Sequence, residues 1–575
     1  MEYHYKHLDE KEIVKINLKE SGKLSFIDNK FYVNNVEVIN NRGIINDEVY
    51  IKDNIVVSIK KRTIVNIVGI LCINSKVKYG MIKDKSLYLF KPSNKNYPNF
   101  YVPYKNTSNI NINMYTVINF NKWDSVSKLP HGILIEVIGE IGNKEVEYEH
   151  LRYYYNIKNN ILKVPKEKIK KDSNLINNLQ SFDYEVFSID PLNSKDIDDA
   201  FHFKILNEHE HEIGIHIASP YHFFKDELYT ILNRVSTIYL PDRKYNMLPN
   251  FYADNIISLI ENELRQAISI IISIKDNNIL NIDVNKTIVK NIKNYDYDTF
   301  DKIYRKKLNL NSFVQFSKNF FKCDEYFDSH ILVEKWMIFA NKFIAKYLID
   351  KNISNLIIRK NDAISLEHSS VVNNEELTNY LNLKREHCAL YEVYDINKRK
   401  TQKHSKLGND YYTHFTSPIR RAVDLFIHGL IIEDKNLIED EFELKQYIEY
   451  INIFTKNSRK FDRNVKRLEF LYNSKKLEEH IVTYGYIVDI NMYRIRVYIP
   501  EYKLEEKIII IPYKFKDIVK INNLLELENN SLNMIDYTID EKNYVYKLYQ
   551  KLELKLWIFI KSENIFDKLK LEIIL

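Results

Sequence analysis

The sequence is poor in residues that interrupt secondary structure, with 11 glycines and 12 prolines among 575 residues, whereas an average protein devotes roughly 12% of its residues to these two types. This scarcity excludes collagen-like chains and disordered chains rich in Pro and Gly. Cysteine is scarcer still, since Cys72, Cys323 and Cys388 are the three in the chain and lie far apart. Three widely spaced cysteines form neither a disulfide framework nor a zinc site, which indicates a reducing compartment.

Long apolar segments are also missing. The N-terminal stretch MEYHYKHLDEKEIVKIN carries charges throughout and lacks the apolar region of a secretory signal. The most apolar stretch, Ala267 to Ile274, is far shorter than the roughly 18–20 residues that cross a bilayer. We therefore expect a soluble, intracellular protein without a membrane partner, located in the cytoplasm or, alternatively, in the nucleus.

Charge and aromatic content permit a nucleic-acid partner without requiring one. Lys and Arg number 84 against 78 Asp and Glu, which gives a net charge of +6 and only a mild basic excess. Tyrosine is abundant, with 43 residues, and two interpretations stay open: coding bias toward A/T-rich codons, or platforms on which bases stack. An apolar fraction of 45% and a charged fraction of 28% are typical of globular proteins.

Strand-like and helical patterns divide the sequence into blocks. Residues 24–157 contain short alternating segments rich in β-branched residues, which predict β-barrels or sandwiches. Residues 159–183 are polar and lysine-rich and are predicted to form a linker. Residues 184–476 mix strand-like runs with helical patterns such as 334–349, and residues 477–575 return to short strands. A multidomain α+β protein is the fold class that this order predicts.

The segment FSIDPLNSKDIDDAF places four aspartates, Asp190, Asp196, Asp198 and Asp199, within ten residues. So many like charges raise one another's pKa unless a cation neutralises them. Clustered carboxylates select Mg²⁺ or Mn²⁺, and one or two such ions activate water at a phosphodiester. A calcium loop is excluded because the spacing does not fit that motif, whereas a solvated acidic turn remains as the alternative. The sequence therefore predicts a metal site.

The segment YYTHFTSPIRRAVDLFIH predicts a second functional element. Ser417 is placed as an N-cap and Pro418 as the first residue of a helix. Arg420 and Arg421 then fall in the first turn, beside free N–H groups and the positive end of the helix dipole, which together favour a bound phosphate. The alternative is a surface ion pair between Arg420 and Asp424, four residues further on.

Together these two segments resemble the catalytic motifs of the RNase II / RNase R family of RNB nucleases. FSIDPLNSKDIDDA resembles that family's aspartate motif at all four carboxylates, and YTHFTSPIRR resembles its arginine motif without a gap. Other stretches resemble the exosome-nuclease branch of this family: NNRGIINDEVYI, WDSVSKLPHGILIEVIGEIG, GIHIASPYHFF, STIYLPDRKYNMLP and YGYIVDINMYRIRVYIPEYKLEEKI. That branch also carries an N-terminal endonuclease domain, which we expect to be absent because the chain begins almost at the first barrel.

The resemblance implies a mixed α/β catalytic RNB domain flanked by OB-fold β-barrels, two of cold-shock type before it and one of S1 type after it. The expected boundaries are 1–70 for the first cold-shock barrel, 71–158 for the second, 159–183 for the linker, 184–476 for the RNB domain and 477–575 for the S1-type domain.

The resemblance also implies an activity, which is processive 3′→5′ hydrolysis of single-stranded RNA to nucleoside 5′-monophosphates with Mg²⁺ or Mn²⁺. In this expectation Asp198 is the aspartate most closely tied to catalysis, and Arg420 contacts the scissile phosphate. The remaining expected roles are metal binding by Asp190, Asp196 and Asp199, and RNA binding by Tyr239, Arg421, Arg494 and Arg496. Tyr239 could instead be a core aromatic residue of a strand, and the two arginines of YRIRVYIP could instead lie on a solvated strand face.

Several positions depart from the family pattern, namely Ser219, Ala422, Gly429 and Lys466. They support a second hypothesis, a catalytically weak or inactive RNA-binding scaffold that keeps the RNB fold. A third hypothesis is a different metal-dependent phosphodiesterase that acts on DNA. Single-stranded RNA is the expected partner of an expected monomer, and association with an RNA-decay complex or a helicase is left open.

Overall fold

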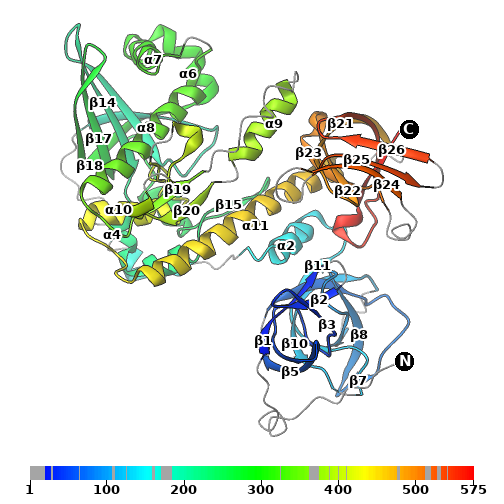
Figure 1. Ribbon diagram of the computed structural model, residues 1–575. Helices are drawn as coiled ribbons and strands as arrows, with labels where there is room; N and C mark the ends of the chain where they lie inside the picture. The colour runs from blue at the N-terminus through cyan, green and yellow to red at the C-terminus, as the bar shows by residue number, and fades with distance from the viewer. Residues whose placement is uncertain are drawn as a thin grey trace. The chain divides into compact units, whose positions relative to one another are not determined.

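The computed structural model describes residues 20–574 except 28–29, 64, 107–110, 125, 158–161, 170–171, 173–183, 324–325, 362–374, 387–388, 399–400, 409–410, 475–479, 512–519, 527–531 and 540–541. Contacts divide the chain into two compact units, Met1–Ile157 with Arg459–Leu575 and Lys158–Ser458, which are described separately (Figure 1). Among the described residues, no helix combines the length and the apolar character that a membrane span needs.

The first unit begins with a five-stranded antiparallel sheet. Its order is β3-β2-β1-β4-β5, and its strands are β1 Glu20–Ile27, β2 Lys30–Val33, β3 Val36–Val38, β4 Glu48–Lys52 and β5 Ile55–Lys61. Asn34 and Asn35 both have positive φ angles, 50° and 66°, as a two-residue hairpin turn requires. Alternate apolar residues such as Leu24, Val33 and Val49 are fully buried, so the alternation in the sequence produces the core.

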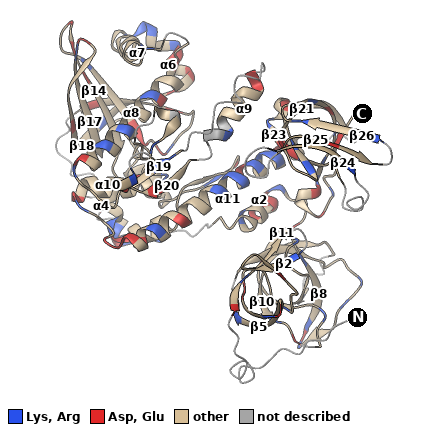
Figure 2. Ribbon diagram, viewed as in Figure 1, with Lys and Arg blue, Asp and Glu red and all other residues tan. Residues whose placement is uncertain are grey.

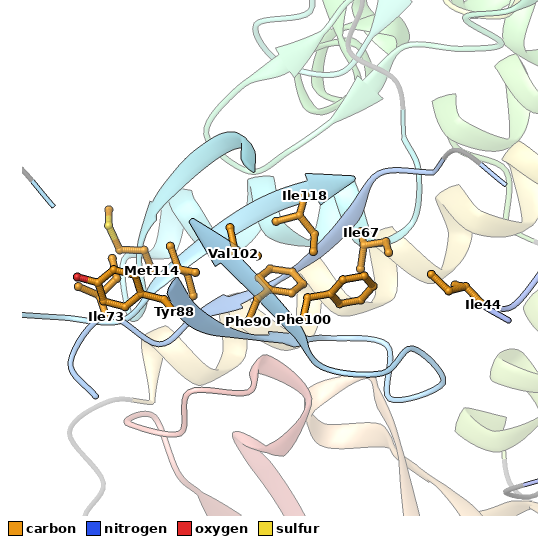
Figure 3. Packing of buried hydrophobic residues seen from close by; sticks show 10 residues of the cluster. Ile44, Ile67, Ile73, Tyr88, Phe90, Phe100, Val102, Met114 and Ile118 are labelled. Atoms are coloured by element: carbon orange, nitrogen blue, oxygen red, sulfur yellow. The ribbon is translucent and has the colours of Figure 1, made fainter. Parts of the chain in front are cut away.

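A six-stranded sheet follows, in the order β6-β10-β11-β9-β8-β7. Its strands are β6 Ile67–Leu71, β7 Met81–Ile82, β8 Lys85–Pro92, β9 Phe100–Tyr104, β10 Met114–Lys122 and β11 His131–Glu140. An additional pairing of β6 with β8 closes the sheet around a core in which Phe90 packs against Phe100 (Figure 3). At Gly69 on β6 a Cβ atom would lie 2.3 Å from the carbonyl oxygen of Lys91, so this close pairing requires glycine.

The first unit ends with the C-terminal strands and the helix α2 (Lys144–Tyr154). Five strands form the order β23-β22-β21-β27-β28, with bounds Leu504–Ile509, Arg494–Ile499, Ile481–Ile490, Lys551–Ile558 and Leu569–Ile573. Three more form β24-β25-β26, with bounds Lys520–Glu526, Leu532–Ile539 and Lys542–Lys547. Lys568 Nζ lies 2.5 Å from Glu147 Oε1 of α2, and both side chains are fully buried. This ion pair joins two parts of the unit that are far apart in sequence.

The second unit is built on a closed barrel in the order β12-β13-β14-β17-β18. The strands are β12 Tyr184–Asp190, β13 Asp199–Ile205, β14 Glu210–Ala218, β17 Leu264–Lys275 and β18 Asn278–Asp296. β12 closes the barrel by pairing in parallel with β18. Because β12 ends at Asp190 and β13 begins at Asp199, the loop between them carries the aspartate motif at one end of the barrel.

Helices and two small sheets complete this unit (Figure 1). The helices are α4 Tyr221–Phe224, α5 Leu228–Leu232, α6 Tyr297–Ile303, α7 Leu308–Phe320, α8 Ser329–Asp350, α9 Glu375–Glu386 and α10 Ala422–Glu433, and the paired strands are β15 Ile238–Tyr239 with β16 Lys244–Tyr245 and β19 Ile357–Lys360 with β20 Leu390–Val393. The helix predicted at 334–349 lies within α8, which begins earlier because Asp328 caps it by accepting from the N–H of Ile331 at 2.9 Å.

The long helix α11 (Glu441–Asn473) runs from the second unit into the first. Glu441 and Glu443 lie in its first turn, which the helix dipole favours, and Lys and Arg recur along its C-terminal half (Figure 2). The α+β fold class is confirmed, with barrel-like sheets before and after the mixed segment in the sequence. The domain boundaries stay predictions, and most of the predicted linker 159–183 lies outside the described residues.

Candidate active site

A cavity of about 1200 Å³ opens in the second unit. The loop between β12 and β13, the β15–β16 hairpin, α8 and the segment before α10 all contribute to its wall. The residues predicted from the two motifs are among those that line it: Asp190, Asp196, Asp198, Asp199, Tyr239, Arg420 and Arg421. Segments up to about 230 residues apart in the chain therefore meet around one space.

Asp198 and Arg420 connect the two motifs directly. Arg420 Nε donates to Asp198 Oδ2 at 3.1 Å, and the backbone N–H of Ile419 donates to Asp198 Oδ1 at 2.9 Å. The Asp198 side chain is only 4% exposed. Burial raises its pKa to about 7, although Arg420 and the N–H of Ile419 both favour the charged form. The pair thus holds the arginine at the cavity wall while the carboxylate stays out of water.

Asp190 and Asp199 are half-buried at adjoining strand ends of the barrel. Burial raises the pKa of each carboxyl group above its usual range; the charges of Asp198 and Asp196 add to the shift of Asp190, and the charge of Asp190 adds to that of Asp199. The Oδ2 atom of each is buried without a hydrogen-bond partner among the described residues. Unpartnered buried carboxylate oxygens are costly and are suitable ligands for a hard divalent cation. These two residues therefore fit the predicted metal site.

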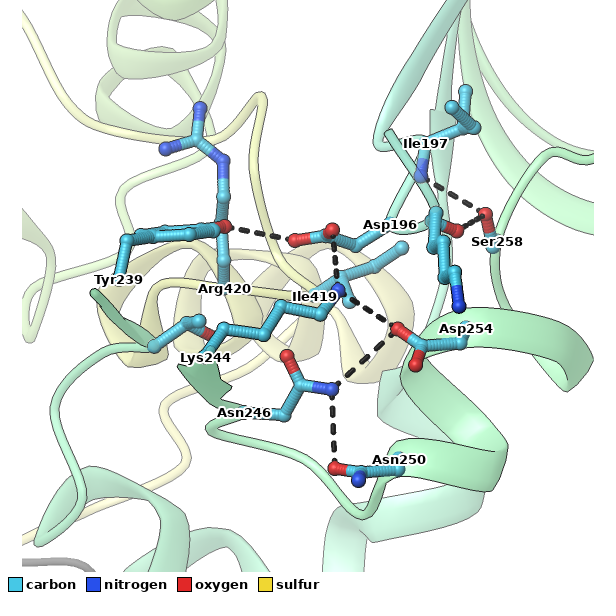
Figure 4. Close-up of polar contacts among 12 residues, drawn as sticks. Asp196, Ile197, Tyr239, Lys244, Asn246, Asn250, Asp254, Ser258, Ile419 and Arg420 are labelled. Atoms are coloured by element: carbon cyan, nitrogen blue, oxygen red, sulfur yellow. Dashed lines mark hydrogen bonds and ion pairs between the residues drawn. The ribbon is translucent and has the colours of Figure 1, made fainter. Parts of the chain in front are cut away.

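Asp196 is engaged differently, as Figure 4 shows. Its Oδ1 lies 2.7 Å from Lys244 Nζ, and its Oδ2 accepts from the Tyr239 hydroxyl at 2.8 Å. Lys244 also lies 2.8 Å from Asp254 Oδ1. Within the described ranges, no three Asp, Glu, His or Cys side chains are arranged so that they could share one ion. In this conformation Asp196 is neutralised by Lys244, and a role as metal ligand would require it to leave that lysine.

Tyr239 lies at the end of the short strand β15 and is 47% exposed. The alternative that it is a core aromatic residue is therefore wrong. Its hydroxyl is fixed by Asp196, and burial of that hydroxyl together with the nearby carboxylate raises the pKa of the phenol. One face of a positioned, accessible ring at the cavity is suited to stacking on a base, although a bound base itself is a prediction.

The helix that carries the arginine motif begins later than predicted. α10 starts at Ala422 rather than Pro418, and Arg421 directly before it is extended, with φ −133° and ψ 124°. The reason is tertiary, because the N–H of Ala422 donates to the carbonyl oxygen of Val235 at 2.8 Å and an isolated bridge joins this segment to that neighbouring strand-like stretch. Arg420 and Arg421 therefore precede the helix, and the predicted phosphate site in its first turn is wrong in position.

Asp424 pairs with Arg421, which corrects the alternative in which it pairs with Arg420. Arg421 Nη2 lies 2.8 Å from Asp424 Oδ1, and the N–H of Ser417 donates to the same oxygen at 2.7 Å. Burial lowers the pKa of Arg421, but the Asp424 carboxylate together with Tyr391 and Tyr412 raises it, and the net shift is upward. Arg421 thus braces the turn behind Arg420, and its direct contact with RNA stays a prediction.

Arg494 and Arg496 belong to the other unit, on β22. Arg496 Nη1 lies 2.8 Å from Glu505 Oε1 and its side chain is half-buried. Arg494 is exposed. Ile495 between them is fully buried, and Tyr498 further along the strand is only 9% exposed. An RNA-binding role for these arginines stays a prediction.

Three positions that depart from the family pattern do not line the cavity. Ser219 is 6% exposed and Ala422 is fully buried, and neither belongs to the cavity wall. At Gly429 a Cβ atom would lie 2.5 Å from the Tyr221 ring. These three residues therefore lie in packed regions outside the cavity, and they do not change the residues that surround Asp198 in its wall. Lys466 lies on α11, exposed to solvent.

Sequence reasoning missed several residues of the wall. Lys244 stands in the motif STIYLPDRKYNMLP, and only its tertiary contact with Asp196 reveals its place. Tyr297 opens α6 beside the barrel, stacks on His330 with ring centroids 3.7 Å apart, and lines the cavity. Arg359 and His404 complete another part of the wall. No local pattern marks these residues, because each acquires its position from contacts distant in sequence.

Comparisons with known proteins agree with this geometry. Residues 178–315 and 308–433 match the RNB domain, and residues 87–156 match the Dis3-like cold-shock domain 2. The chain is 24% identical over 550 residues to a Caenorhabditis elegans protein described as probable exosome complex exonuclease RRP44, which covers 78% of this chain and 57% of that protein. It is 28% identical over 387 residues to ribonuclease R of Ureaplasma parvum, with coverage of 52% and 53%. The chain thus spans about half the length of these curated relatives.

Solved structures share the fold at low sequence identity. Mycoplasma genitalium RNase R in complex with ribose methylated single-stranded RNA superposes with a TM-score of 0.71 at 18% identity, covering 96% of this chain and all of that one. Yeast Ssd1, a pseudonuclease, superposes with a TM-score of 0.65 at 14% identity, covering 99% and 98%. At such identities the likeness concerns the fold alone, which both an RNase and a pseudonuclease adopt.

Proposed function

This chain belongs to the RNB-domain family, and on that premise we propose that it is a hydrolytic 3′→5′ exoribonuclease that degrades single-stranded RNA processively to nucleoside 5′-monophosphates. The observation that carries the proposal is the ion pair between Asp198 and Arg420 at the wall of the cavity. It joins the two motifs beside Asp190 and Asp199, each of which has one buried carboxylate oxygen without a hydrogen-bond partner among the described residues. The matched relatives described as exonucleases and ribonuclease R support the same activity.

A divalent cation, Mg²⁺ or Mn²⁺, fits Asp190 and Asp199, whose unpartnered oxygens face the same buried region. Asp196 would join them after releasing Lys244. When bound, such an ion lowers the pKa of water and stabilises negative charge on a phosphoryl oxygen. The pattern of donors, which are all carboxylate oxygens, favours a hard cation over zinc.

The chain's own residues position the substrate. Arg420 offers a guanidinium that is partly exposed, with 42% of its side chain accessible, and a fixed guanidinium stabilises the charge that develops on a phosphate during attack. Asp198 orients that guanidinium through Nε, and Nη2 donates to the Ser417 hydroxyl at 2.9 Å, so that Nη1 is the nitrogen left to donate to the phosphate. Tyr239 presents an aromatic face on which the base at the 3′ end stacks.

A digestion assay tests the proposal. RNA of 30 nucleotides labelled at its 5′ end is incubated with the full chain and Mg²⁺, together with a matched 2′-deoxy strand and an EDTA control. The proposal expects progressively shortened RNA, release of nucleoside 5′-monophosphates and no shortening of the DNA. A trap of unlabelled RNA added after binding leaves the shortening of bound strands unchanged if the enzyme is processive. Mononucleotides absent from the wild-type reaction would overturn the proposal.

A second candidate is an RNA-binding protein without turnover. One observation favours it, the neutralisation of Asp196 by Lys244, and the fold is shared with a pseudonuclease. This candidate predicts RNA binding that weakens with salt and no metal-dependent products in the same assay. The proposed partner in both cases is single-stranded RNA, bound by a monomer whose mass light scattering would report.

A further inference from the structure

Arg359 is an arginine of the cavity wall without a carboxylate partner among the described residues. It lies on β19, opposite Tyr391 of β20, and its guanidinium carbon stands 5.0 Å from the centre of the Tyr391 ring. The adjacent Lys360, by contrast, faces Glu392 at 3.8 Å. The two other arginines of the motif region each have an acidic partner. Arg359 therefore brings an uncompensated positive charge to the cavity.

His404 supplies an independent sign that a ligand is recognised at the same place. It is 7% exposed and lines the cavity, and its Nδ1 is buried without a hydrogen-bond partner among the described residues. Buried polar atoms are rarely left unpaired. Its pKa is lowered to about 4 by burial and by the nearby Arg359, so the ring is neutral and carries one N–H donor.

Tyr412 ties these two residues into one part of the wall. Its carbonyl oxygen accepts from the backbone N–H of Arg359 at 2.7 Å, and its ring centre lies 5.2 Å from that of His404. Tyr412 itself is fixed by Asn341 of α8, whose Nδ2 donates to its hydroxyl at 3.0 Å. The donors are thus held by the scaffold and do not depend on a flexible surface side chain.

The cavity has room for more than one nucleotide. At about 1200 Å³ it exceeds the roughly 300–1000 Å³ of small-molecule pockets. Its lining includes both the carboxylates Asp190 and Asp199 and the guanidinium of Arg359. A single strand that places its scissile phosphate at Arg420 brings further phosphates along the wall. Each of them carries a negative charge, which an arginine can bind through two parallel hydrogen bonds.

We propose that Arg359 and His404 form a second phosphate subsite, which binds a backbone phosphate of the RNA other than the one at Arg420. The inference rests on the proposed function, because it assumes that single-stranded RNA enters this cavity. The subsite would bind the strand upstream of the scissile bond. It would therefore contribute to RNA affinity and to retention of the shortened strand, and not to the chemical step.

The test combines a protein variant with a chemical change in the ligand. Binding of a fluorescent 12-nucleotide RNA to the full chain is measured in EDTA, and each of the four linkages nearest the 3′ end is replaced in turn by an uncharged methylphosphonate. Arg359→Met is compared with Arg305→Met, a matched control because Arg305 also lies over a tyrosine ring, 5.6 Å from the centre of Tyr304, and does not line the cavity.

For wild type, a methylphosphonate at the linkage held by Arg420 weakens binding, and a methylphosphonate at one linkage upstream of it also weakens binding roughly tenfold, as loss of a charge-assisted contact does. The upstream linkage is the one assigned to Arg359. Arg359→Met weakens binding of the unmodified RNA by a similar factor and is insensitive to that same methylphosphonate. Its plot of log Kd against log salt is shallower by about 0.7, the slope expected of one phosphate contact on a single strand. Arg359→Lys gives an intermediate affinity, and His404→Asn gives a smaller loss at the same linkage. Arg305→Met behaves as wild type.

Three results would overturn the inference. The first is that Arg359→Met matches Arg305→Met in affinity and salt slope. The second is that it keeps the wild-type methylphosphonate profile, which would assign Arg359 a structural role over Tyr391. The third is that it changes only inhibition by a nucleoside 5′-monophosphate, which would place the released product at the site. If wild type binds no RNA, the proposed function fails instead. Should Arg359→Met not fold, Arg359→Lys provides the same comparison.

Discussion

Asp198 accepts a hydrogen bond from Arg420 across 222 residues of sequence, at 3.1 Å from Nε to Oδ2. The same carboxylate also accepts from the backbone N–H of Ile419. One aspartate therefore fixes both the guanidinium and the turn from which it projects. Asp198, which the resemblance predicted to be the aspartate most closely tied to catalysis, thus also links the two motifs at the cavity wall.

Replacement of Asp198 tests whether its contact with Arg420 serves RNA turnover or the stability of the fold. Asp198→Asn is nearly isosteric but lacks the charge that orients Arg420, so we expect RNA turnover to fall by at least about 100-fold, since removal of one preorganised electrostatic contact costs roughly 10²–10³ in rate. Burial already favours the neutral carboxyl form, so the melting temperature should change little. Product release and thermal unfolding check both statements. Asp276→Asn, an exposed acid near His209, is the matched control, and unchanged turnover in Asp198→Asn would contradict the assignment.

The paired carboxylates Asp190 and Asp199 predict a linked effect of pH and metal. Their pKa values are raised in the folded state, so the metal-free protein binds more protons folded than unfolded. The contribution of these two groups to stability is therefore greatest below the ordinary carboxyl pKa, near 4, and falls as pH rises toward the raised values. Mg²⁺ should restore the stability lost at pH 8 and should release protons when it binds.

Calorimetric titration with Mg²⁺ in two buffers of different ionisation enthalpy measures this proton release, and melting curves at several pH values measure the stability. Asp199→Asn should abolish most of the pH dependence and weaken metal binding. Identical heats in the two buffers, or an unchanged melting profile in Asp199→Asn, would show that these carboxyl groups do not hold the ion.

Tyr239 allows the ring and the hydroxyl to be examined separately. Tyr239→Ala should weaken RNA binding by about 1–3 kcal/mol, the contribution of one base stacked on an aromatic ring. Tyr239→Phe keeps the ring and loses only the hydrogen bond to Asp196, so its RNA affinity should remain close to wild type. Anisotropy with labelled RNA in EDTA gives both values. Equal losses in the two variants would indicate that the hydroxyl, and not stacking, is responsible.

Acid should destabilise the protein through buried neutral histidines. Burial lowers the pKa of His150 and of His428 to about 3, against about 6.5 for the unfolded chain. The unfolded state then binds more protons between pH 6.5 and pH 3, so stability falls as pH drops through that window. His150→Gln should reduce the slope of unfolding free energy against pH in denaturant titrations. His222→Gln, at an exposed position, should leave it unchanged, and a slope equal in both variants would refute the explanation.

The buried ion pair of Lys568 and Glu147 should be essential to the stability of the first unit. Both side chains are fully buried, so Lys568→Met leaves an uncompensated charge and should cost about 3–5 kcal/mol in unfolding free energy. Combining it with Glu147→Met removes both charges and should recover much of that loss. Urea unfolding of the single and double variants measures the coupling. The exposed pair Lys30 and Glu37, with more than half of each side chain accessible, should contribute less than about 1 kcal/mol in the same comparison.

Local sequence was enough to identify most of the fold and the core of the site. Alternating β-branched segments predicted the strands, because one buried face requires an apolar residue at every second position. The two motifs are contiguous, so all four aspartates and Arg420 could be named before their geometry was known. The helix start at Pro418 was wrong, because the pairing of Ala422 with Val235 prevails over a local start signal.

The sequence by itself therefore determined the type of chemistry, through an aspartate cluster and an arginine motif whose residues lie near one another in the chain. Only the tertiary structure decided which of these groups face each other. It pairs Asp198 with Arg420, Asp424 with Arg421 and Asp196 with Lys244. It also placed Arg359 and His404 on the same cavity wall. The physical reason is that charge pairing and burial depend on distance in space, and folding brings together side chains whose separation in sequence carries no such information.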